Sequence, residues 1–152
     1  MSLKDRLTED MKDAMKAKDA GKLRLSVIRM VRAEIKNQEI EKARELNDEE
    51  IVLVISREAK LRRDSIPEYE KAGRVDTIET LNEEINILMS YLPRQLTKEE
   101  ILNLVKQAAH ELKADKPQDI GKIMGRIVPA TRGKADGKTV NEIVRKVLNG
   151  EL

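Results

Sequence analysis

Residues 119–141 read Asp-Ile-Gly-Lys-Ile-Met-Gly-Arg-Ile-Val-Pro-Ala-Thr-Arg-Gly-Lys-Ala-Asp-Gly-Lys-Thr-Val-Asn. Four of the seven glycines of the chain fall here, in two pairs with a four-residue spacing: Gly121, Gly125, Gly133 and Gly137. A glycine inside a helix costs ~1 kcal/mol relative to alanine. Two glycines at helical spacing therefore predict the close approach of another backbone, from a neighbouring helix or from a nucleic-acid strand.

The first half of this stretch predicts an amphipathic helix. Gly121 and Gly125 fall on one edge of its apolar face, and Lys122 and Arg126 fall on the solvent-facing side. Pro129 is expected to kink or end the helix, because proline lacks the amide that the preceding turn needs. A tight helix–helix contact with ordinary solvated lysines is the alternative to ligand approach. The apolar face consists of Ile120, Ile123, Met124, Ile127 and Val128.

The second half, Gly133 to Thr139, is similar to a phosphate-binding P-loop only at first sight. The P-loop pattern needs a glycine where Arg132 stands, and it follows a strand rather than a helix. A glycine turn between two helices fits better, with Gly133 in the left-handed conformation after a helix end. Asp136 is then expected to be the N-cap of a last helix that ends near Asn149.

Helical patterns fill the rest of the chain and predict an all-α protein with seven main helices. Asn47 with Glu50, and Thr97 with Glu100, form capping boxes that open two of them. The run 51–55 has the propensity of a strand, but its charged, helix-forming flanks favour a helix. We expect two domains: residues 1–95 with about four helices, and residues 96–152 with three. The seven helices are expected at about 3–15, 23–40, 48–72, 74–92, 98–112, 116–128 and 137–149.

Charge is unevenly distributed along the chain. The whole chain has 30 basic and 28 acidic residues, whereas residues 116–149 contain eight basic and three acidic ones. A local excess of this kind is typical of proteins that bind a phosphate backbone, although a merely solvated face would give the same count. Tyr69 and Tyr91 are the only aromatic residues, so bases have no stacking platform, and a folded or duplex RNA is the expected ligand. The candidate nucleic-acid contacts are Lys122, Arg126, Arg132, Lys134, Lys138 and Arg145.

Residues that carry catalysis or bind metals are scarce. There is no cysteine, His110 is the only histidine, and no carboxylate pair stands in an apolar setting. We therefore expect no catalytic residue, no metal site and no cofactor. No apolar run approaches the ~18 residues of a membrane span. The first ten residues are charged from the fourth position onward and are not typical of a signal peptide, so we expect a cytoplasmic protein.

Three short segments near the carboxyl end, 124–126, 133–137 and 140–141, resemble the tail of the B subunit of the glutamine-dependent tRNA amidotransferase. Four segments upstream, 10–16, 25–30, 72–76 and 91–96, resemble the bacterial YqeY family, whose stand-alone proteins carry the same tail. The resemblance covers essentially the whole chain. It implies an all-helical protein with a three-helix carboxyl-terminal domain, which in the amidotransferase helps to hold the tRNA body.

Three functions follow from these observations. The first is a module that binds tRNA or another structured RNA, with a possible protein partner in tRNA-dependent amidation. The second is a protein-interaction adaptor whose glycine edge meets a partner helix. The third is a self-sufficient carbon–nitrogen ligase that uses glutamine as the amido donor, but its nucleophile and ATP site are not visible in the sequence.

Overall fold

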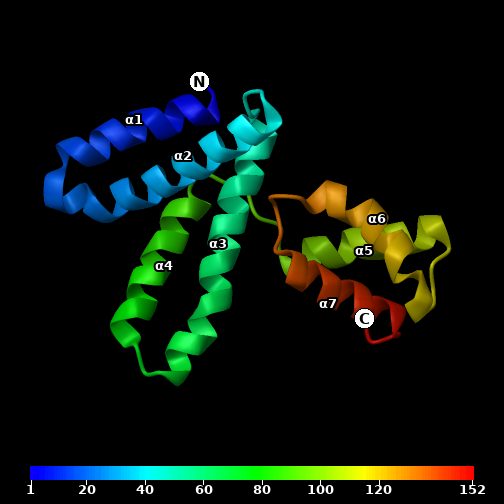
Figure 1. The fold of residues 1–152 in the computed structure, drawn as a ribbon. Helices are drawn as coiled ribbons and strands as arrows, with labels where there is room; N and C mark the ends of the chain where they lie inside the picture. Colours follow the sequence, from blue (N-terminus) through cyan, green and yellow to red (C-terminus); the bar gives the residue numbers. More distant parts are fainter. The chain divides into compact units, whose positions relative to one another are not determined.

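The computed structural model describes all residues, 1–152, and the chain is entirely helical (Figure 1). Seven α-helices and two short 3-10 turns follow one another, without a strand. The helices form two compact units, Met1–Leu92 and Pro93–Leu152. The predicted all-α class and the number of helices are confirmed. Residues 1–95 and 96–152 as separately folding domains stay a prediction.

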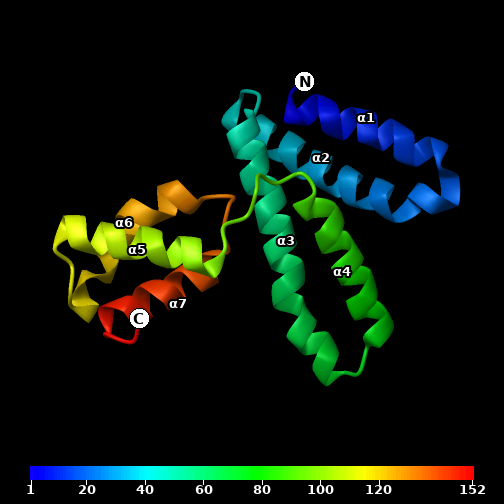
Figure 2. The ribbon, with the colours of Figure 1, turned by 180° about the vertical axis from the view of Figure 1, so that it is seen from behind.

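The first unit contains two helical hairpins, which Figures 1 and 2 show from opposite sides. The first hairpin pairs α1 (Leu3–Lys16) with α2 (Lys22–Lys42) through the 3-10 turn η1 (Lys18–Gly21), and the second pairs α3 (Asp48–Lys71) with α4 (Val75–Met89). Residues of both hairpins form one apolar core, so each hairpin buries its apolar face against the other. The core is made of Leu7, Val27, Ile28, Val31, Ile35, Leu46, Ile51, Val54, Ile55, Ala59, Leu88 and Tyr91.

Helix α3 starts where the sequence predicts. The Asn47 side chain accepts a hydrogen bond from the Glu50 amide at 2.9 Å, and the Glu50 carboxylate accepts one from the Asn47 amide at 3.1 Å. The run 51–55 is helical, so the strand alternative is wrong. Pro67 lies within α3 without ending it, and Gly73 follows the helix with a φ of 67°.

Polar side chains tie the first unit together at two places. Arg62 is buried in α3 and forms ion pairs with Glu58 at 2.9 Å and with Glu84 of α4 at 3.1 Å. The Tyr91 hydroxyl donates to the Asp10 carboxylate, and Asp10 also pairs with Arg24. Helices α1 and α2 are thereby joined to the segment that follows α4.

The second unit is a three-helix arrangement with its own core. Helix α5 (Lys98–Leu112) leads through the 3-10 turn η2 (Pro117–Asp119) to α6 (Ile120–Thr131) and then to α7 (Gly137–Leu148). The expected start of the sixth helix at about residue 116 is wrong by one turn. The Asp119 carboxylate accepts hydrogen bonds from the Asp115 and Lys116 amides at 3.2 Å, and the turn η2 forms there before α6 begins. The core is made of Ile101, Val105, Ala108, Ala114, Ile123, Ile127, Val140, Ile143, Val144 and Leu148.

None of the seven helices combines the length and the apolar character that crossing a membrane requires.

Candidate nucleic-acid interface

Helix α6 buries one face in the core of the second unit and leaves its glycines exposed. Ile123 and Ile127 are almost completely buried. Gly121 and Gly125 lie on the opposite side, and a Cβ atom built on either would meet no atom within 4 Å. The expectation that these glycines serve a tight helix contact inside the chain is therefore wrong. Their backbone is open to an external partner.

Pro129 lies inside α6, which continues to Thr131. Of the two predicted effects, Pro129 does not end the helix, and a kink there stays a prediction. The buried Thr131 hydroxyl donates to the Ile127 carbonyl at 2.9 Å and supports the last turn. Proline has no amide, so the Gly125 carbonyl loses its helical donor four residues on. The exposed side of α6 thus has a flat glycine backbone, and the Gly125 carbonyl lacks the amide that would bond it four residues on.

The two cations of α6 are both engaged within the unit. Lys122 lies 3.6 Å from the Asp119 carboxylate, and Arg126 donates to the Glu111 carboxylate of α5 at 2.6 Å. Hydrogen bonds from Gln107 and Arg126 lower the pKa of Glu111. Because carboxylates already neutralise them, these two cations are weaker candidates for phosphate contacts than the sequence suggests.

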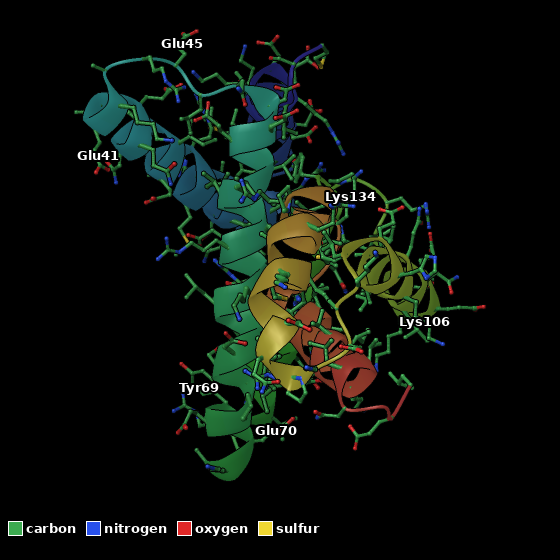
Figure 3. All side chains as sticks on the ribbon, turned by 90° about the vertical axis from the view of Figure 1, so that its right-hand side faces the viewer. Glu41, Glu45, Tyr69, Glu70, Lys106 and Lys134 are labelled. Atoms are coloured by element: carbon green, nitrogen blue, oxygen red, sulfur yellow. The ribbon has the colours of Figure 1, made fainter.

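The turn between α6 and α7 is held by hydrogen bonds to the segment that precedes α5. Gly133 is buried with a φ of 76°, as predicted. Its carbonyl accepts from the Gln95 side chain at 3.0 Å, and the Lys134 carbonyl accepts from the Leu96 amide at 2.8 Å. The Lys134 amide in turn donates to the Thr131 carbonyl at 2.8 Å. The backbone of this turn is therefore fixed, and Lys134 is labelled on it in Figure 3.

Three cations at this turn are free within their unit. Arg132, Lys134 and Lys138 are exposed, and none forms an ion pair or a side-chain hydrogen bond with another residue of the second unit. Arg145, on α7, instead donates to the Asn141 side chain at 2.7 Å. Of the six predicted contacts, the structure therefore gathers three unpaired ones at the braced turn, which we call the cationic turn (Arg132, Lys134 and Lys138).

Asp136 is the N-cap residue of α7, as predicted, but its side chain accepts no hydrogen bond from the helix amides. Its Oδ1 atom is buried without any hydrogen-bond partner. A carboxylate at the positive end of a helix is electrostatically favourable. Its negative charge also opposes a phosphate at the same place. The cationic turn is therefore electrostatically more favourable for a phosphate than the free amides of α7 are.

The sequence did not indicate Gln95 and Leu96 as the support of the cationic turn. Both hydrogen bonds connect residues 38 positions apart, Gln95 with Gly133 and Leu96 with Lys134. The one sequence signal for Gln95 and Leu96 was that the chain has both a glycine turn after α6 and a polar loop before α5. Among all residues described, no three His, Cys, Asp or Glu side chains are grouped in a way that could hold a metal ion.

Two proteins with the same name are similar to most of this chain. A protein of Pyrenophora tritici-repentis named altered inheritance of mitochondria protein 41, mitochondrial, is 30% identical over 96% of this chain and 81% of its own length. The Kluyveromyces lactis protein of the same name is 37% identical over 81% of this chain and 70% of its own length. These names place the fungal relatives in mitochondria, so the cytoplasmic location expected from the sequence stays a prediction.

A shorter similarity links the chain to part of an enzyme. The B subunit of the aspartyl/glutamyl-tRNA(Asn/Gln) amidotransferase of Clostridium novyi is 41% identical over 59 residues, which are 34% of this chain and 12% of that protein. The family model described as Yqey-like protein matches residues 4–148. The all-helical fold, the glycine turn and this match over nearly the whole chain establish that the protein belongs to the YqeY family.

Proposed function

We propose that the second unit binds tRNA or another structured RNA through the cationic turn. The observation that carries the proposal is the state of its three cations, which are exposed and unpaired within the unit on a backbone held by Gln95 and Leu96. Because the backbone is already fixed, phosphate binding by unpaired cations costs little backbone entropy. A paired cation must first break its ion pair with a carboxylate.

Two further observations support RNA binding by the second unit. The second unit contains 12 basic and eight acidic residues, while the first contains 18 and 20. The similarity to part of an amidotransferase also concerns a protein whose name includes tRNA. The proposed role is that of a non-catalytic module that holds RNA, with a protein partner in tRNA-dependent amidation as one setting. Because both tyrosines lie in the first unit, the second unit has no aromatic residue, and its contacts follow backbone shape rather than base identity.

Binding of the full chain to total tRNA, measured at several salt concentrations, tests this proposal. Arg132, Lys134 and Lys138 are replaced together by Gln. Each phosphate neutralised on a duplex contributes about 0.9 to the slope of log affinity against log salt, so the slope should fall by about 2.7 if all three cations contact phosphates. The affinity should fall with it, while the melting temperature stays unchanged.

A matched control replaces Lys98, Lys106 and Lys113 by Gln. These lysines are also exposed and without ion pairs in the second unit, so the net charge changes equally. We expect the control to keep most of the affinity. If both triple variants lose the same affinity, binding is a general charge effect and the site is wrong. If the first variant folds and binds tRNA as the parent does, the RNA function is wrong.

The second candidate function is a protein adaptor, and the exposed face of α6 favours it. Val128 is 37% exposed beside the uncovered glycines, and the flanking cations are engaged with Asp119 and Glu111. A partner helix could approach such a surface closely. A tRNA titration without any binding, together with capture of a defined protein that Gly125→Leu abolishes, would favour the adaptor over the RNA module.

A further inference from the structure

A groove of about 600 Å³ lies between α1 and α2 in the first unit, where Figures 1 and 2 show the two helices side by side. Its apolar lining comes from Leu7 and Met11 of α1 and from Ala33 and Ile35 of α2. Ala33 is exposed, and its small side chain leaves the groove open. Small-molecule sites typically measure about 300–1,000 Å³ and are lined mainly by apolar groups, so this groove has a suitable size and lining.

Three cations of α2 line the same groove: Arg29, Arg32 and Lys36. Their spacing of three and four residues places them on one stripe of the helix. None of them forms an ion pair within the first unit, whereas other cations of α2 do: Arg24 pairs with Asp10, and Lys42 with Glu50. Arg29, Arg32 and Lys36 are therefore unpaired cations that line a groove with an apolar surface.

The two acidic residues of the groove do not neutralise the positive charge of Arg29, Arg32 and Lys36. Glu39 is already bound to Lys4 at 2.6 Å and accepts the Leu46 amide at 2.9 Å, and both contacts lower its pKa. Asp5, on α1, is exposed and forms no ion pair. The lining as a whole contains four basic and two acidic side chains, and one of those acids is engaged by Lys4.

Arg32 is the most informative of the three cations. It is half-buried, and its Nη1 atom reaches across the groove to the Met11 sulfur at 2.7 Å. A thioether is a weak acceptor, and a guanidinium has five N–H donors. A cation that is partly removed from water without an anion is unfavourable unless a ligand supplies the negative charge.

We propose that this groove binds a small amphipathic anion, an apolar chain or ring that carries one carboxylate or phosphate group. The apolar part lies on Leu7, Met11 and Ala33, and the aliphatic stems of the cations extend that surface. The head group accepts hydrogen bonds from Arg29, Arg32 and Lys36, with the planar guanidinium groups suited to two-point contacts. The ligand is a free molecule rather than a membrane surface, because the cations line a groove.

Titration of the ¹⁵N-labelled full chain with dodecanoate or dodecyl phosphate, below their micelle concentrations, tests this proposal. Saturable chemical-shift changes are expected at residues 4–11 and 29–39. Dodecyltrimethylammonium, which has the same chain and a positive head, should bind at least tenfold more weakly. If it binds as tightly as dodecanoate, or if the shifts fall elsewhere, the proposed site is wrong. Binding only to anionic phosphatidylserine vesicles, without binding of either monomeric probe, also contradicts it.

Variants separate the groove from general charge. Replacing Arg29, Arg32 and Lys36 together by Gln should weaken dodecanoate at least tenfold. A control replaces Lys12, Lys16 and Lys22 by Gln, three exposed cations of α1 and α2 outside the groove and without ion pairs, and should change affinity less than twofold. Ala33→Leu, which fills the groove at an exposed position, should weaken both anions while leaving the melting temperature unchanged. Equal losses in the two triple variants would overturn the proposal.

Discussion

Gly21 is a position where the structure predicts a large effect of adding a single methyl group. It is buried at the end of η1, where the chain turns from α1 into α2. A Cβ atom on Gly21 would lie 2.2 Å from the Ala14 carbonyl oxygen and 2.8 Å from the Ala14 Cα and carbonyl carbon. All three are backbone atoms of α1, so no side-chain rotation relieves the contact. Gly21→Ala must instead push α1 and α2 apart.

The loss of stability in Gly21→Ala is set by the cost of adding a methyl group to a contact that is already closely packed. Extra methylene groups in a well-packed core cost typically 1–3 kcal/mol, and a clash between backbones belongs at the upper end, about 3 kcal/mol. The first unit comprises residues 1–92. In a domain of that size each kcal/mol lowers the melting temperature by roughly 4–8 °C, so we expect a decrease of about 12–24 °C for this unit.

Thermal unfolding followed by circular dichroism, with amide hydrogen exchange to assign the loss to α1 and α2, measures this decrease. Gly121→Ala is the matched control, because its Cβ meets no atom within 4 Å and alanine favours a helix by ~1 kcal/mol. The double variant Gly21→Ala, Ala14→Gly should stay destabilised, since the contact involves backbone atoms. A melting temperature of Gly21→Ala within about 2 °C of the parent would refute the close approach.

Three further predictions concern other parts of the chain. The Arg94 side chain and the Thr97 amide lower the pKa of Glu100 from 4.5 to about 2, so the stabilisation is complete above pH 4.5 and is lost as the pH falls towards 2. The difference in melting temperature between the parent and Glu100→Gln should therefore shrink between these pH values. Arg62→Ala leaves two carboxylates without their partner and should lower the free energy of unfolding by about 3 kcal/mol in urea titrations. Gly125→Leu should not lower the melting temperature, but should reduce affinity for whichever partner approaches α6; an unchanged affinity for RNA and for captured protein would contradict that use of the face.

Local signals in the sequence predicted most of the fold. The Asn47–Glu50 and Thr97–Glu100 capping boxes each act over three residues, and both form as expected. Gly133 and Gly150 adopt the positive φ that ends a helix. The charged, helix-forming flanks of residues 51–55 correctly outweighed the strand propensity of this run, because they contain no turn residues. Signals of this kind depend on neighbours within one or two turns, which the sequence shows directly.

Contacts between distant residues were not predictable in the same way. The glycine pair of α6 drew attention to close packing, yet the close approach inside the chain occurs at Gly21, which carries no spacing pattern. The engagement of Arg126 depends on Glu111 of another helix, 15 positions away. The glycine turn groups Arg132, Lys134 and Lys138 in the sequence already, but only the structure shows that carboxylates engage Lys122 and Arg126.

The exposed glycines of α6 remain unexplained by the stability of the second unit. Gly125, in the interior of the helix, costs ~1 kcal/mol relative to alanine, and at both glycines no atom of the fold occupies the space that a methyl group would take. Pro129, two turns after Gly121, also removes the amide that would bond the Gly125 carbonyl. Three residues that weaken a helix along one exposed strip are readily accounted for if a partner approaches that backbone and supplies a donor, such as an RNA 2′-hydroxyl or a peptide amide. Gly125→Leu blocks the approach to the strip formed by Gly121, Gly125 and Pro129 without placing a side chain in the core. The triple variant of the cationic turn leaves α6 unchanged, so the two variants test the two surfaces separately.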